Sequence, residues 1–183
     1  MTSPASTEPP SPGAPDQARA QPGADTPPKG QGRVFLVVVD ETPELKVALL
    51  YACRRAQKTG GRVALLHVAE TGDFQQFLGV GKVMAQETRQ AAETLMQKMA
   101  AEVYRLSGTM PVLYLREGDR RDELIKLIDE EPSISILVLG ASTSAKGPGP
   151  LVSALSGKFV GRLRVPLTIV PGNLTEEDIE SIA

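Results

Sequence analysis

ILVLGASTSAKGPGPLVSALSGKF, residues Ile136–Phe159, contains an apolar run that stops at Gly140, a loop rich in glycine, serine and proline, and a short segment with helical spacing of apolar residues. A second apolar run, RVPLTIVPG, begins at residue 164. Strand, small-residue loop, helix and strand in this order form anion sites at the carboxyl edge of parallel α/β sheets. The stretch therefore predicts a parallel α/β fold and makes its loop the first candidate for a phosphate site.

The rest of the chain repeats this alternation of apolar runs and helical segments. β-branched, continuous apolar runs are typical of strands buried on both faces, and five runs are expected to be strands: residues 34–40, 62–70, 111–118, 133–140 and 165–172. Four segments with helical spacing lie between them. We therefore expect an α/β fold with an open five-stranded parallel sheet, right-handed crossovers and helices on both faces.

Capping residues predict where several helices begin and end. Thr42 is expected to cap the first helix and Asp119 the third, because both residue types accept a hydrogen bond from the first helical turn. Gly108 is the expected C-cap of the long second helix. The short helix after the glycine-rich loop is expected to bury three residues on one stripe, Leu155, Phe159 and Val160.

Composition excludes several classes of protein. The chain has 183 residues and a net charge of −2, which favours neither nucleic acid nor an acidic membrane surface as a partner. One cysteine excludes an internal disulfide and a cysteine-based metal site, and it suits a reducing compartment. The apolar runs are too short to span a membrane, and no signal peptide is visible, so we expect a cytoplasmic protein without a metal site.

The two ends of the chain differ from the expected domain at residues 33–172. Residues 1–32 hold eight of the 15 prolines and no large apolar residue beyond Met1, so they are expected to form a disordered tail. Residues 173–183, NLTEEDIESIA, are acidic. Thr175 can cap a short helix there, with Ile179 and Ile182 available to dock, although a frayed tail is the alternative.

The order and spacing of VVVDETPE, LLHVAE, REGDRRDEL, ILVLGAS and VPLTIVPG resemble the universal stress protein family over residues 33–172. The resemblance implies a Rossmann-like sheet of order 3-2-1-4-5, as in the adenine nucleotide alpha hydrolases. It also implies a homodimer in which the edge strand Val165–Val170 meets its copy. Many family members bind ATP, with slow hydrolysis at most, whereas others lack the nucleotide site and act through protein contacts.

The resemblance assigns nucleotide-binding roles to residues after three strands. Asp40 would face the adenosine and the backbone of Val68 the adenine, while the loop after the fourth strand would hold the phosphates. Nucleotide-binding members carry Gly-x2-Gly-x9-Gly-[Ser/Thr] in this loop, and the chain departs from that pattern in either of two registers. The candidate nucleotide-binding residues are Asp40, Val68, Leu139, Gly140, Ser142, Thr143, Gly147, Ser153 and Ala154.

The phosphate loop is degraded whichever register is used. Without a gap, Gly140 is kept, but Thr143 and Ser153 replace glycines and Ala154 replaces the hydroxyl. In a shifted register, Gly147 and Gly157 keep the nine-residue gap while Ser144 and Lys158 replace the other two positions. Pro148 and Pro150 also remove N–H donors from the loop.

Neither nucleophilic nor basic side chains form a catalytic constellation in the sequence. His67, the only histidine, and Cys53, the only cysteine, are both interpreted as packed residues. Two functions stay open. One is a dimeric stress-response protein that binds ATP or another adenine nucleotide. The other is a nucleotide-free family member that acts as a protein-interaction module.

Overall fold

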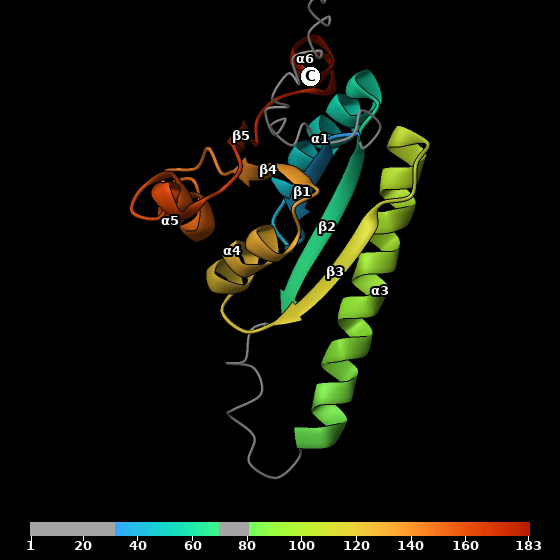
Figure 1. Ribbon diagram of the computed structural model, residues 1–183, viewed down its shortest axis with the longest axis vertical. Helices are drawn as coiled ribbons and strands as arrows, with labels where there is room; N and C mark the ends of the chain where they lie inside the picture. Colours follow the sequence, from blue (N-terminus) through green and yellow to red (C-terminus); the bar gives the residue numbers. More distant parts are fainter. Residues whose placement is uncertain (1–31, 70–80) are drawn as a thin grey trace, which may run out of the picture.

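Five parallel strands form one sheet in the order β3-β2-β1-β4-β5 in the computed structural model, which describes residues 32–69 and 81–183 (Figure 1). The strands are β1 Val34–Val38, β2 Arg62–Ala69, β3 Val112–Glu117, β4 Ile134–Ala141 and β5 Leu167–Pro171. The helices are α1 Leu45–Thr59, α3 Gly81–Ser107, α4 Arg120–Glu130, α5 Pro150–Ser156 and α6 Glu176–Ile182, with a 3₁₀ turn at Val160–Arg162. The fold and strand order expected from the sequence are confirmed. The expected N-terminal tail lies outside the described residues except for its last residue.

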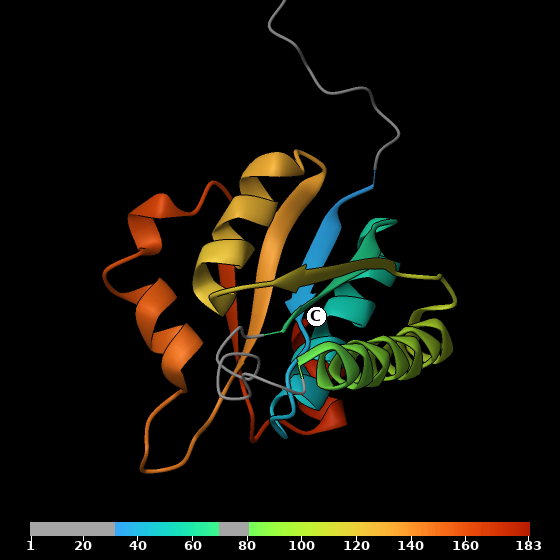
Figure 2. The same ribbon diagram turned by 90° about the horizontal axis from the view of Figure 1, so that it is seen from below.

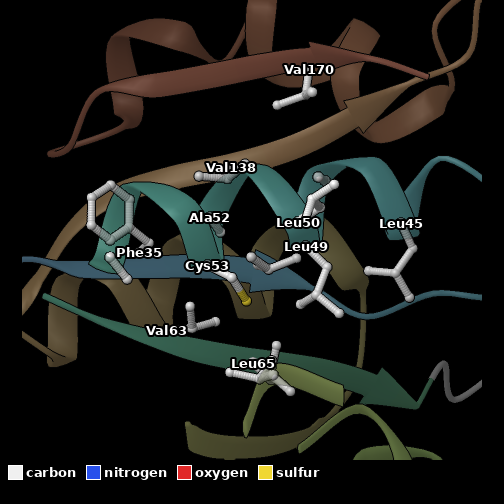
Figure 3. Close-up of a cluster of buried hydrophobic side chains, with 14 of the residues drawn as sticks. Phe35, Leu45, Leu49, Leu50, Ala52, Cys53, Val63, Leu65, Val138 and Val170 are labelled. Atoms are coloured by element: carbon white, nitrogen blue, oxygen red, sulfur yellow. The ribbon is translucent and has the colours of Figure 1, made fainter. Parts of the chain in front are cut away.

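Helices cover both faces of the sheet (Figure 2). Successive side chains of a strand point to opposite faces, and β1 shows this in its packing. Phe35 and Val37 contact the core under α1, α3 and α6, whereas Leu36 and Val38 contact the core under α4 and α5. Every residue of β1 is buried, as expected for a central strand in a doubly covered sheet. Figure 3 shows part of the first core, where Cys53 points from α1 toward the sheet.

Two of the expected helix boundaries are confirmed. Asp119 caps α4 by accepting a hydrogen bond from the Asp122 N–H at 2.9 Å. Gly108, at φ 73°, follows α3 and donates its N–H to the Tyr104 carbonyl. The left-handed conformation explains the glycine, because side chains disfavour it.

Two other expectations about helices are wrong. Thr42 does not cap α1: its hydroxyl donates to Asp40 instead, and the residue before the helix is Glu44, which has no side-chain cap bond. Val160 is not buried with Leu155, since 54% of its surface is exposed. Helix α5 ends at Ser156, and Gly157, at φ −104° and ψ −113°, turns the chain out of the helical path.

Residues after β5 form helix α6, which packs on α1. Thr175 and Asp178 form a reciprocal capping box at its start, and the hydrogen bonds from Thr175 lower the pKa of Asp178. Ile179 is fully buried in the core, whereas Ile182 is 54% exposed. At the other end, the Lys58 Nζ donates to the carbonyls of the last turn, where a positive charge is favourable. No helix within the described ranges has the length and apolar character needed to cross a membrane.

Candidate functional site

Two cavities adjoin at the carboxyl edge of the sheet. The larger has a volume of about 570 Å³ and lies between the ends of β1 and β2 and one side of α3. The smaller, of about 140 Å³, lies between the start of α1, the end of β4 and the loop that leads into α5. Asp40, Thr42 and Arg120 line both cavities. A ligand that spans both would therefore pass these three side chains.

The larger cavity combines a carboxylate with an apolar wall. Asp40 follows β1, and its Oδ1 accepts hydrogen bonds from the Thr42 N–H at 3.1 Å and the Thr42 hydroxyl at 2.6 Å. These bonds fix the carboxylate and leave its second oxygen available to a ligand. The wall opposite is formed by α3 through Thr88, Ala91, Ala92 and Leu95.

The end of β2 forms the floor of this cavity. Pairing between β1 and β2 ends with Val38 opposite Leu66, so β2 continues past β1 through Val68 and Ala69, which line the cavity. His67 directly precedes Val68 in the chain, and its Nδ1 donates to the Val39 carbonyl at 3.1 Å. The imidazole therefore has a structural partner at the point where the two strands separate.

The loop after β4 makes its hydrogen bonds within itself. The Ser142 N–H donates to the Pro148 carbonyl at 3.2 Å, and the Gly147 N–H donates to the Ser144 carbonyl at 3.1 Å. The Ser144 N–H is 3.3 Å from the Ser142 hydroxyl, which donates to the Ser144 hydroxyl in turn. A phosphate cradle needs several N–H groups directed at the anion. Here three of these donors already have acceptors in the loop.

Gly140 is required by a close contact within the protein. A Cβ at this position would lie 2.5 Å from the Glu44 carbonyl oxygen, closer than real Cβ atoms come to other atoms. The glycine allows the backbone that enters α1 to pack directly on the end of β4. Its presence in the sequence is therefore explained without a phosphate.

A model of the universal stress protein family matches residues 33–171, which is nearly the whole of the sheet and its helices. The chain belongs to the universal stress protein family. None of the curated proteins compared matches the chain. Residues 172–183, with helix α6, lie beyond the matched region.

Solved universal stress proteins share this fold at low sequence identity. UspA from Lactobacillus plantarum is 17% identical with a TM-score of 0.62, and the match covers 76% of this chain and 98% of that one. A family protein from Burkholderia pseudomallei is 18% identical with a TM-score of 0.58, covering 79% and 99%. A universal stress protein in complex with cAMP is 12% identical with a TM-score of 0.52, covering 78% and 99%.

The candidate residues of this universal stress protein fall into three groups. Asp40 and Val68 line the larger cavity. Asp40 also lines the smaller cavity, together with Leu139, Gly140 and Ser142. The remaining four line neither cavity: Thr143, Gly147, Ser153 and Ala154. The structure thus brings together the candidates nearest the strand ends, and from the far end of the loop it is Pro148, Gly149 and Pro150 that line the smaller cavity.

Sequence reasoning missed the wall that α3 contributes. The helical spacing of Ala91, Leu95, Met99, Val103 and Leu106 in the sequence predicts that Ala91 is on the buried side of this helix. In the structure Ala92 is buried and Ala91 is exposed at the cavity. A one-residue shift in the assigned stripe is enough to hide this wall, since adjacent helix positions point about 100° apart. The sequence feature that could have indicated this wall is the pair of small residues on that side of the helix, Thr88 and Ala91.

Cys53 has no access to either cavity. It is fully buried between α1 and the sheet (Figure 3). Burial raises the pKa of its thiol to about 12, so the reactive thiolate is absent near neutral pH. Among the residues that the structure describes, no three His, Cys, Asp or Glu side chains lie close enough to hold a metal ion.

Proposed function

We propose that this universal stress protein binds the adenosine part of an adenine nucleotide in the larger edge cavity, and that the phosphate groups add little to its affinity. The observation that carries the proposal is the contrast at this edge. The cavity at Asp40 and Val68 is open, whereas the N–H groups of the β4 loop bond within the loop. ATP, ADP, AMP and adenosine would then bind with similar strength.

The larger cavity has the size and chemistry for a nucleoside. A volume of about 570 Å³ lies within the range of small-molecule sites. The Asp40 carboxylate is a pure acceptor, and it matches the donors of a ribose hydroxyl or of the adenine amine. Ala91, Ala92 and Leu95 offer an apolar surface for the flat base.

Weak phosphate recognition follows from the donors that the loop has lost. Pro148 and Pro150 carry no N–H, and the Ser142 and Gly147 N–H groups have partners in the loop. A phosphate would have to break those bonds before it gained new ones. Arg120 supplies positive charge at the junction of the cavities, which favours at most one phosphate there.

Calorimetry with adenosine, AMP and ATP tests this proposal. We expect all three ligands to bind within about threefold of one another, because few phosphate contacts are available. A tenfold difference in affinity would correspond to about 1.4 kcal/mol. Binding of ATP about a hundredfold tighter than adenosine would contradict the closed loop. Absence of binding by all three at millimolar concentration would refute the nucleoside site.

A nucleotide-free interaction protein is the second candidate. The β4 loop favours it, since its polar groups form hydrogen bonds with one another and do not form a phosphate cradle. The calorimetric experiment separates the two candidates, and so does the nucleotide content of protein purified from cells. Adenine recovered with the protein would exclude the second candidate.

We also propose a cytoplasmic homodimer formed through β5. This strand is a sheet edge, and its Ile169 side chain is 39% exposed. An apolar edge strand is a template for pairing with a second chain. Ile169→Lys should therefore convert a dimer into a monomer in sedimentation experiments. Leu115→Lys on the opposite edge strand, where Leu115 is 36% exposed, is the matched control and should not change the mass.

A further inference from the structure

Helix α6 lies outside the region matched by the family model, yet it is part of the hydrophobic core. The match ends at residue 171, and α6 begins at Glu176. Ile179 is fully buried, and Ala183, which follows the helix, is only 8% exposed. Both residues belong to the core between the sheet, α1 and α3, and Leu174 packs against the same core. This side of the sheet is therefore completed by residues that follow the matched region.

Two cations of α1 bind the C-terminal ends of α3 and α6. Arg54 donates to the Leu106 carbonyl, in the last turn of α3, at 3.1 Å. One turn further along α1, Lys58 donates to the carbonyls of Glu180 and Ala183 at 3.0 Å and 2.9 Å. The last carbonyls of a helix have no partner within it and carry partial negative charge, so a cation is favourable at each of these ends. One side of α1 therefore holds both helices.

Arg54 also connects the ends of α3 and α6 to each other. Its guanidinium forms an ion pair with the Glu180 side chain of α6 while it donates to the Leu106 carbonyl of α3. The Arg54 side chain is 28% exposed, so this pair is partly shielded from water. α6 thus helps to hold Arg54 in the position from which it binds α3. A displacement of α6 can therefore reach the end of α3 through one side chain.

Packing also links α6 to the larger edge cavity. Leu95 of α3 lines that cavity, and it packs against the same core that contains Ile179. Met99 and Leu106, further along α3, pack against this core as well. α3 is one continuous helix of 27 residues, and a contiguous chain of packed side chains can carry a shift from one of its ends to the other. The cavity wall opposite Asp40 therefore depends on how α3 is seated on the core.

We propose that α6 is a strap that holds α3 against α1 and thereby sets the shape of the larger edge cavity. This role rests on the proposed binding of a nucleoside in that cavity. With α6 docked, the α3 wall is held in place and the base packs against it. When α6 detaches, Arg54 loses its ion pair and the core loses Ile179, so α3 shifts and the base loses part of its wall. A helix of seven residues is too short to be stable alone, so α6 forms only while it is docked.

Calorimetry with adenosine tests the coupling between α6 and the cavity. Ile179→Ala removes the buried anchor of α6 and should weaken adenosine binding at least about fivefold, the lower end of the range for coupled sites. Ile134→Ala is the matched control, because Ile134 is also buried but belongs to the core on the other face of the sheet, at the start of β4. This variant should be destabilised to a similar extent and keep its adenosine affinity. Wild-type affinity in Ile179→Ala would overturn the proposal.

A milder change tests the strap where the core stays intact. Glu180→Gln removes the ion pair with Arg54 and should weaken adenosine binding about twofold, within the range of a surface ion pair. Glu177→Gln removes the same charge from α6 and should leave the affinity unchanged.

The coupling must also act in the reverse direction, because linkage between two sites is reciprocal. Saturation with adenosine should slow hydrogen exchange at the Ile179 and Ala183 amides, which bond to the carbonyls of Thr175 and Ile179. Unchanged exchange in α6 on saturation of the wild-type protein would contradict the coupling.

The position of α3 tests the strap without a nucleoside. Spin labels on Gln97→Cys in α3 and Asp129→Cys in α4 report a distance across the sheet, and the buried Cys53 is not accessible to the label. Adding Ile179→Ala should change this distance by about 1–2 Å, the scale of helix shifts in switching proteins, and adding Ile134→Ala should not. An unchanged distance with Ile179→Ala would refute the strap. A changed distance in a protein whose wild type binds no adenosine would support the strap and refute the nucleoside site alone.

Discussion

The two halves of the carboxyl edge are both formed by the ends of parallel strands, but one half contains an open cavity and the other a loop whose polar groups bond to one another. At the ends of β1 and β2, the Asp40 carboxylate faces a cavity of about 570 Å³ and α3 supplies a wall of small residues. At the end of β4, the loop residues form hydrogen bonds with one another, and the adjoining cavity is only about 140 Å³. The cavity can therefore stay open while the loop beside it is closed, because the two halves depend on different bonds.

Filling the open half should have the largest effect. Ala91→Trp places an indole in the cavity opposite Asp40, and we expect adenosine binding to fall at least about a hundredfold, or about 2.7 kcal/mol. Ala101→Trp is the matched control, because Ala101 is also exposed on α3 but lines neither edge cavity. Calorimetry measures both. If the Ala91 variant retained adenosine affinity, the ligand would have to bind elsewhere.

A change at the boundary between the halves should destabilise the fold. Gly140→Ala introduces a Cβ 2.5 Å from the Glu44 carbonyl oxygen, and such overpacking lowers the free energy of unfolding by about 2 kcal/mol. Gly161→Ala is the control, since no atom lies within 4 Å of its added Cβ, and it should change stability by less than about 0.5 kcal/mol. Urea denaturation gives both values. Equal stability of the two variants would show that the backbone of Glu44 is free to move.

Removing a single polar group should reduce ligand affinity more in the open half than in the closed half. Asp40→Asn keeps an oxygen that can accept from Thr42 but removes the negative charge, so adenosine affinity should fall about tenfold, or about 1.4 kcal/mol. Ser153→Ala in the other half should change ATP affinity by less than about twofold. Asp129→Asn, an exposed carboxylate on α4, controls for the loss of charge. A greater loss with Ser153→Ala than with Asp40→Asn would reverse the roles of the two halves.

Restoring the family pattern should have the smallest effect. Thr143→Gly, Ser153→Gly and Ala154→Ser together recreate the glycines and the hydroxyl of the ungapped register. We expect the ratio of ATP to adenosine affinity to rise less than about threefold, because Pro148 and Pro150 still lack N–H groups. Titration of the same variant with adenosine is the internal control. A rise of tenfold or more would mean that the replaced side chains, rather than the prolines, keep the loop closed.

The strands could be predicted from the sequence because buried strands consist of continuous runs of apolar residues. Val34–Val38 is continuously apolar and lies at the centre of the sheet, and the family resemblance supplied the strand order. A helix boundary was less predictable where one side chain has two alternative hydrogen-bond partners. Thr42 has the residue type of a cap, but its hydroxyl bonds to Asp40.

The candidate site was predictable at the strand ends and not in the loop. Asp40 and Gly140 lie where apolar runs stop in the sequence, and the family resemblance assigned their candidate roles. The sequence shows which loop residues carry donors, but the acceptor of each donor depends on how the loop closes, as in the bond from Ser142 to Pro148. The wall at Ala91 was hidden for a similar reason, since a one-residue difference in helical phase separates a core side chain from a cavity side chain.

His67 makes the larger cavity directly observable. It is the only histidine in the chain, its ring lines the cavity, and its Nδ1 is bonded to the Val39 carbonyl. The side-chain imidazole signals in an NMR spectrum of the protein therefore come from one residue and need no assignment. A base that stacks in the cavity would shift these signals, so that occupancy can be followed in the isolated protein without labelling the ligand.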